Sequence, residues 1–189
     1  MNIDDLTIEV RDSDLQRVGR LIGTDLVDSE FVLRFNEPGS WKVVLHNTSP
    51  MAGLLSQPGY GLIVTGPTGV IMSGPMVSSK LVQSQDDADG TWEILGVDDS
   101  IVLVDRLAYP DPTSADVSAQ GAAFDVREDA AETVLKGYVD ANLVSGPTVR
   151  QVANLTVEAD AGRGETVYGS ARFEKLQDLF FGLAQSGQI

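Results

Sequence analysis

Residues 60–77, YGLIVTGPTGVIMSGPMV, decide the fold of the first half of the chain. Two apolar runs, residues 62–64 and 70–72, flank the turn Gly66-Pro67-Thr68-Gly69. Glycine and proline in this arrangement are typical of a β-hairpin. Pro75 has no backbone N–H, so a strand that contains it is expected to lie at an edge or to bend there.

Outward from this hairpin, short strand patterns recur over residues 6–97. Residues 6–11 alternate apolar and polar side chains, the period of a half-buried strand. Pro50 is in the favoured position to begin a short helical turn at 51–55. Further strands are expected at 18–24, 31–35, 41–46, 60–65, 70–77 with an extension at 80–84, and 91–97. About seven short strands separated by turns predict a closed or nearly closed β-barrel or a sandwich.

The second half of the chain has a different pattern. Residues 109–114 form a rigid polar connector, and 115–122 are expected to be a loop. Helical spacing of apolar residues predicts helices at 128–141 and 173–184. Strands are expected at 155–159 and 167–171, on either side of a glycine-rich tip at 160–165. Gly187 is expected to cap the last helix and Ile189 to begin another strand, so we expect the fold to continue in a longer protein.

The composition limits the possible functions. The chain has 189 residues and no cysteine, and 28 acidic against 13 basic residues give a net charge of −15. A field of this sign repels phosphate backbones and anionic membranes, so sequence-specific nucleic-acid binding is not expected. The first residues contain no apolar signal segment, and no apolar stretch is long enough to span a bilayer. We therefore expect a protein that is made in the cytoplasm and is not inserted in a membrane.

The sequence assigns no catalytic, cofactor-binding or metal-binding residue. His46 lies in an apolar strand without a Gly-x-Ser-x-Gly motif, which favours a histidine of the core or the barrel wall over a catalytic base. Asp86-Asp87-Ala88-Asp89-Gly90 fails the EF-hand template, because Gln85 and Gly96 fall at its first and twelfth positions. We therefore expect residues 86–90 to form a solvent-exposed hairpin tip and not a calcium-binding loop.

Other polar and aromatic motifs are equally weak. Gly162-Arg163-Gly164-Glu165 is not followed by the Lys-Ser/Thr of a P-loop. The adjacent carboxylates Asp98-Asp99 are weak evidence for a catalytic acid/base pair, because neighbouring acidic residues are common in so acidic a chain. Trp41 and Trp92 both lie in apolar strands, so we expect them in the core rather than on a sugar-binding surface.

The order of short motifs along the chain nevertheless resembles a known family. The series is similar to the N-terminal region of minor tail proteins, of the baseplate-hub or tail-associated-lysin-like type, from phages with long non-contractile tails. The motifs, none of them catalytic, are residues 37–41, 49–55, 58–64, 72–77, 98–99, 105–112, 130–142 and 170–176.

The resemblance implies an α+β, mainly β fold: a small N-terminal β-barrel at residues 1–104, followed by an α+β domain at 105–189 that continues in the full protein. It also implies a structural, non-enzymatic protein of the virion tail tip, without cofactors. Three copies would form a baseplate hub that joins the hexameric tail tube to the threefold tip and lets DNA pass. The expected partners are distal tail and tail-tube proteins, the tape measure protein, and tail fibres or other tip proteins.

Two alternative functions stay open from the sequence. One is a module of the tail tip that binds cell-wall polysaccharide, although aromatic residues make up only 6% of the chain. The other is a component of a cell-wall hydrolase, for which these residues supply neither a nucleophile nor a metal site.

Overall fold

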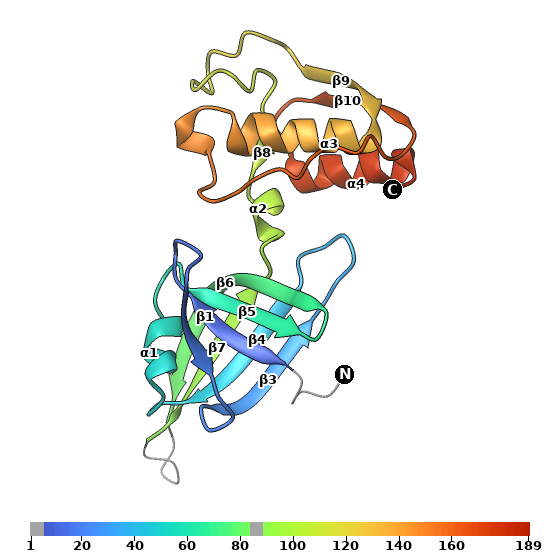
Figure 1. Cartoon of the computed structure of the whole chain (residues 1–189). Helices are drawn as coiled ribbons and strands as arrows, with labels where there is room; N and C mark the ends of the chain where they lie inside the picture. Colours follow the sequence, from blue (N-terminus) through green and yellow to red (C-terminus); the bar gives the residue numbers. More distant parts are fainter. Residues whose placement is uncertain (1–5, 84–88) are drawn as a thin grey trace. The chain divides into compact units, whose positions relative to one another are not determined.

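The computed structural model describes residues 6–83 and 89–189 (Figure 1). The chain divides into an N-terminal unit, Met1–Ile101, and a C-terminal unit, Val102–Ile189. The fold is α+β and mainly β, with a seven-stranded antiparallel sheet as its largest element.

The N-terminal unit contains this sheet and one short helix. Its strands have the order β2-β1-β5-β6-β7-β4-β3, and every neighbouring pair is antiparallel. The elements are β1 (Thr7–Arg11), β2 (Arg17–Leu21), β3 (Leu26–Val32), β4 (Ser40–His46), α1 (Pro50–Leu55), β5 (Gly61–Gly66), β6 (Gly69–Val82) and β7 (Thr91–Val97).

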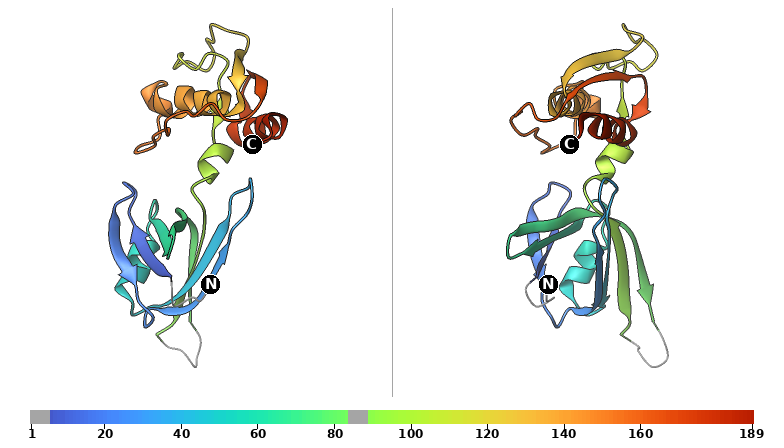
Figure 2. Two further views of the ribbon diagram at one scale, coloured as in Figure 1. Left: turned by 45° about the vertical axis from the view of Figure 1, so that its right-hand side comes forward. Right: turned by 90° about the vertical axis from the view of Figure 1, so that its right-hand side faces the viewer.

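The strand β6 bends and is shared by the two halves of the sheet. Residues up to Pro75 pair with β5, and residues from Met76 pair with β7. The expected bend at Pro75 is therefore confirmed, and Figure 2 shows the two halves facing different directions. The register shifts between Met76 and Ser78, the kind of bulge that increases local twist and turns a strand.

The sheet does not close into a barrel, so the expectation of a closed barrel is not confirmed. Its end strands β2 and β3 are not hydrogen-bonded to each other within the described residues. A short turn joins them, in which the Asp25 carboxylate accepts a hydrogen bond from the Ile22 backbone N–H at 2.9 Å. The Asp25 backbone N–H in turn donates to the Ile22 carbonyl at 2.9 Å. In this part of the chain, the two strands leave the turn with free outer edges.

The strand predicted at 31–35 lies earlier in the chain. β3 covers Leu26–Val32 and is paired with β4, with Phe31 opposite Trp41. Its end is set by the following hairpin bend, where Asn36 has a left-handed φ of 57°. Residues 33–35 therefore belong to the hairpin tip.

The core of the N-terminal unit forms around Trp41, which is 2% exposed. The Trp41 indole donates a hydrogen bond to the Val97 carbonyl at 3.1 Å. Trp92 is only half-buried and donates to Asn47 Oδ1 at 2.8 Å, so it lies at the margin of the core. The prediction of a core position is thus confirmed in full for Trp41 and only in part for Trp92.

Helix α1 begins as predicted, with Pro50 in its first turn. Ser49 Oγ accepts a hydrogen bond from the Met51 backbone N–H, which satisfies one of the free donors at the start of the helix. The helix adds Ala52 and Leu55 to the core of the N-terminal unit.

The C-terminal unit packs two helices against short two-stranded sheets. α2 (Ile101–Val104) lies at the boundary between the units, and a π-helical turn (Asp140–Val144) extends α3. The remaining elements are β8 (Leu107–Ala108), β9 (Asp125–Ala130), α3 (Ala131–Val139), a 3-10 turn (Thr148–Arg150), β10 (Thr166–Ala171), β11 (Glu174–Lys175) and α4 (Leu176–Gly187).

Several predicted boundaries in this unit are wrong. Residues 128–130 belong to strand β9 and not to the helix, because they pair with β10. Residues 155–159 form no strand, since β10 is the strand that pairs with β9. The last helix begins at Leu176 rather than at Phe173, because Phe173 has a φ of 60° and donates its N–H to the Ala108 carbonyl. The cap that ends this helix is the left-handed Gln188, one residue after the predicted Gly187.

Gly96→Ala is expected to destabilise the N-terminal unit. Gly96 lies opposite Trp41 in the β4–β7 pair, and a Cβ there would be 2.1 Å from the indole ring. The clash is expected to lower the melting temperature in a thermal denaturation experiment. Gly53→Ala is the control: it adds a Cβ to α1 with nothing within 4 Å, and alanine favours a helix by about 1 kcal/mol over glycine. Equal effects of the two substitutions would contradict this packing.

Trp41→Ala and Trp92→Ala are expected to differ in cost. Removal of a fully buried tryptophan typically costs about 3–5 kcal/mol. Trp92→Ala should cost clearly less, because its side chain is half-buried. Chemical denaturation of the two variants measures the difference, and a larger loss for Trp92→Ala would show that the core is centred elsewhere.

Candidate functional site

His46 does not lie in the core. It is exposed, which corrects the prediction of a core histidine, but as the last residue of β4, paired with Thr91, it does belong to a strand of the sheet. Alternate residues of β4, namely Trp41, Val43 and Leu45, point inward, so His46 lies on the opposite, outer face of the strand. Its backbone N–H donates to the Asp25 carbonyl at 3.0 Å, so the residue helps to fix the β2–β3 turn.

Asp98 and Asp99 have separate structural roles at the end of β7. Asp98 Oδ2 accepts from the Gly39 backbone N–H at 2.5 Å, and Asp98 Oδ1 accepts from the Ser100 N–H at 2.9 Å. Asp99 accepts two hydrogen bonds from the guanidinium of Arg11, at 2.5 and 3.1 Å. Arg11 is 5% exposed, so the pair holds a buried cation at the end of β1. The motif ties three strand ends together and does not form a pair of acid and base.

The glycine-rich segment at 162–165 packs on helix α3. Gly162 and Gly164 have positive φ values of 63° and 87°, which glycine adopts without strain. The turn they form brings the Arg163 side chain and backbone N–H to the carboxylate of Glu132, at 2.9 to 3.0 Å. Lys136 Nζ donates to the same carboxylate at 2.7 Å. This cluster was not found from the sequence, because Glu132 and Arg163 are 31 residues apart.

The cluster keeps Glu132 ionised. Hydrogen bonds from Arg163 and then from Lys136 hold the pKa of the Glu132 carboxyl far below its ordinary value of 4.5. The same turn provides acceptors for backbone N–H groups at the start of α3, which have no partner within the helix. The N–H of Ala131 donates to the Glu165 carbonyl, and the N–H of Glu132 donates to the Arg163 carbonyl. The arrangement fixes the loop to the helix.

The connector predicted at 109–114 is held by a buried arginine. The Arg150 guanidinium lies 3.9 Å from the centroid of the Tyr109 ring and donates to the Pro112 carbonyl. The Tyr109 backbone N–H donates to Asn142 Oδ1 at 3.0 Å. Residues of the motif 105–112 are thus anchored on the turns that follow α3.

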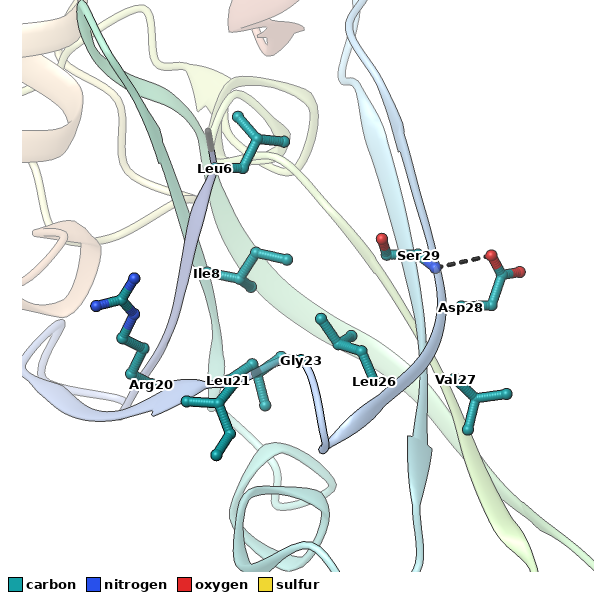
Figure 3. Close-up of a pocket in the computed structure, with 10 residues that line it drawn as sticks. Leu6, Ile8, Arg20, Leu21, Gly23, Leu26, Val27, Asp28 and Ser29 are labelled. Atoms are coloured by element: carbon teal, nitrogen blue, oxygen red, sulfur yellow. Dashed lines mark hydrogen bonds between the residues drawn. The ribbon is translucent and has the colours of Figure 1, made fainter. Parts of the chain in front are cut away.

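One candidate binding feature is a groove in the N-terminal unit. It has a volume of about 510 Å³ and lies between β1 and β2 on one side and β3 on the other (Figure 3). Figure 3 shows Ile8 and Leu26 pointing into the space between these strands, whereas the side chains of Arg20 and Asp28 point away from it on either side. The groove is the gap left by the unclosed sheet, and its floor is apolar.

The described part of the chain has no grouping of three or more His, Asp or Glu residues that could hold a metal ion. The hairpin tip expected at 86–90 lies mostly outside the described residues. Within residues 6–83 and 89–189, no helix combines the length and apolar character needed to cross a bilayer.

A family model described as "Siphovirus ReqiPepy6 Gp37-like protein" matches residues 7–189, which is nearly the whole chain. The chain belongs to this siphovirus Gp37-like family. None of the curated proteins matches the sequence.

One solved structure of a tail protein shares the fold of this Gp37-like chain. The tail protein from Neisseria meningitidis MC58 matches with a TM-score of 0.53 and 14% identity, over 96% of this chain and 45% of that one. The 43 kDa tail protein of prophage MuSo2 from Shewanella oneidensis matches with a TM-score of 0.46 and 10% identity, over 97% and 49%. The chain thus spans less than half the length of each of these tail proteins.

Glu132→Gln is expected to remove part of the acid sensitivity of this Gp37-like chain. Because the folded pKa of Glu132 is lowered, its carboxylate stabilises the fold at pH values above 4.5. This stabilisation is lost as the pH falls from 4.5 through the lower folded value. The variant should therefore melt below the wild type at neutral pH, and the difference should narrow between about pH 5 and pH 3.

Glu128→Gln is the matched control for this measurement. Glu128 is exposed on β9 and forms no ion pair among the described residues. It should follow the wild-type melting curve over the same pH range. A difference between Glu132→Gln and wild type that stays constant with pH would contradict the role of the carboxylate.

Proposed function

We propose that this chain is a structural protein of the siphovirus tail and acts at the tail tip. The observation that carries the proposal is the fold match to a tail protein over 96% of the chain, together with membership in a siphovirus family. The low identity of 14% limits that match to the fold, so the position in the tail rests on the motif order as well.

The specific role we propose is a homotrimeric baseplate hub that joins the tail tube to the threefold tip. Its partners would be distal tail and tail-tube proteins, the tape measure protein, and tail fibres or other tip proteins. The open sheet of the N-terminal unit supports this role, because an unpaired strand edge is a template on which a segment of a neighbouring chain can pair. We expect at least one of the tips at 66–69 and 86–90 to contact a neighbouring subunit or another tail protein.

The charge of the chain supports passage of DNA through such a ring. With a net charge of −15, the surface offers phosphate groups few cations to bind, so DNA gains little from counterion release there. In this proposal the surplus carboxylates lie toward the lumen or the outer surface, because unpaired charge is costly in a buried joint.

The alternative of a polysaccharide-binding module has less support. Trp41 is buried and cannot stack on a sugar ring. The exposed aromatic side chains come from four separate segments and do not follow one another along a strand or helix as a platform would require: Phe35, Phe124, Tyr168 and Phe181.

Purified particles of the virus that encodes the chain provide the test. Immunogold labelling with an antibody against the N-terminal unit is expected to mark the tail tip, and reconstruction is expected to show three copies around the tail axis. An antibody against the major capsid protein serves as the control for specificity. Label on heads, or particles that lack the chain, would contradict a role in the tail, whereas a different copy number at the tip would contradict only the trimeric hub.

A further inference from the structure

The hairpin between β3 and β4 exposes large apolar side chains at its tip. Phe35 is 90% exposed and Leu33 is 60% exposed, and both follow directly after the end of β3. Isolated exposed apolar residues are common, but an aromatic ring at the end of a projecting hairpin offers a compact contact for a partner. Figure 1 shows this hairpin extending beyond the neighbouring strands.

The groove at the other end of β3 has the complementary character. Its floor is formed by Leu6, Ile8, Leu21 and Leu26, and its volume of about 510 Å³ is in the range of sites that enclose bulky apolar groups. The rims are formed by the edge strands β2 and β3, whose outer backbone groups have no strand partner in the described chain and can bind an incoming segment.

The charges of the tip and the groove match. Arg34 and Glu37 flank Phe35 in the hairpin, and Asp28 and Arg20 lie on opposite rims of the groove. None of these four side chains forms an ion pair within the part of the chain that the structure describes. Seated in a groove, the tip can pair Arg34 with Asp28 and Glu37 with Arg20. Such pairing favours one orientation of the contact.

The tip cannot fill the groove of its own chain. Asp28 and Phe35 are seven residues apart along a strand and its extension, which separates them by roughly 20 Å at ~3.3 Å per residue. The hairpin tip and the groove therefore lie at opposite ends of β3 in each copy. A contact between such unlike patches is heterologous, and it closes into a ring when the rotation between copies allows it.

We propose that the β3–β4 hairpin tip of one copy, with Phe35 at its centre, docks in the β2–β3 groove of a second copy of the same chain. This docking rests on the proposed function in one respect, namely that several copies meet around the tail axis, and it specifies the surface by which they do so.

Cysteine cross-linking tests the docking directly, because the natural chain has no cysteine. Phe35→Cys is mixed with an equal amount of Val27→Cys, whose residue is exposed on the groove rim, and the mixture is oxidised. Disulfide-linked dimers of the two variants are expected to exceed those of Phe35→Cys alone. Val149→Cys, 77% exposed in the C-terminal unit, is the control partner and should give only the background yield. Equal yields with Val27→Cys and Val149→Cys would overturn the proposal.

A second measurement separates docking from the general assembly of copies. Phe35→Asp should weaken self-association in sedimentation experiments by about tenfold or more, as expected for a central aromatic contact. Val149→Asp, 77% exposed in the 3-10 turn of the C-terminal unit, is the control. Both variants should keep the wild-type melting temperature, because both side chains are exposed.

The outcomes distinguish this proposal from the tail-tip function. Trimers that form normally with Phe35→Asp, and without the Phe35–Val27 cross-link, would overturn the docking but leave the hub intact. Cross-links from Phe35→Cys to a different tail protein in purified particles would also overturn it, in favour of that protein as the occupant. Failure of the tail-tip function would instead appear as absence of the chain from tails, whatever the cross-linking shows.

Discussion

The path of β6 is the constraint on which the N-terminal unit depends. A single strand of 14 residues supplies the pairing edge for β5 in its first half and for β7 in its second half. The transfer occurs at Gly74-Pro75, where a Cβ on Gly74 would lie 1.8 Å from the Val97 carbonyl oxygen. The close approach allows the sheet to fold over, so that side chains from its two halves share one core: Trp41, Val43, Ile94, Ile8, Leu62 and Val64. A straight β6 would leave a flat sheet with no second layer to bury these side chains.

The same bend determines where the sheet stays open. Once β5 and β7 are placed by β6, β1 and β4 pair outside them, and β2 and β3 become the ends. The turn at 22–25 joins these ends but does not bring their edges together, which produces the apolar groove. Arg11 and Asp99 tie the end of β1 to the segment after β7. The groove is thus a consequence of the topology rather than of a local loop.

The sequence predicted what depends on neighbouring residues and missed what depends on distant ones. The hairpin at 66–69, the start of α1 at Pro50 and the bend at Pro75 follow from local backbone chemistry, and all three are present. Whether β2 and β3 pair is set by strands far along the chain, so periodicity could not decide between a closed barrel and an open sheet. Residues 128–130 resemble the acidic first turn of a helix, and only their pairing with β10 shows that they form a strand. For the Glu132–Arg163 cluster, the only local feature that the sequence shows is the pair of glycines that allow the turn. Nothing in the sequence indicates that Arg163 binds Glu132.

Charge sets the conditions under which copies of this chain can meet. Six of its 13 basic residues form ion pairs within the described residues: Arg11, Arg17, Lys42, Arg127, Lys136 and Arg163. Each copy still carries a net charge of −15, so two copies repel each other once they are within about 10 Å, the screening length at moderate salt. A stable contact must therefore combine buried apolar surface with locally paired charges, because dispersed acidic faces would add only repulsion. Phe35 between Arg34 and Glu37 concentrates these properties in a few residues, at the tip of a hairpin that projects from the N-terminal unit.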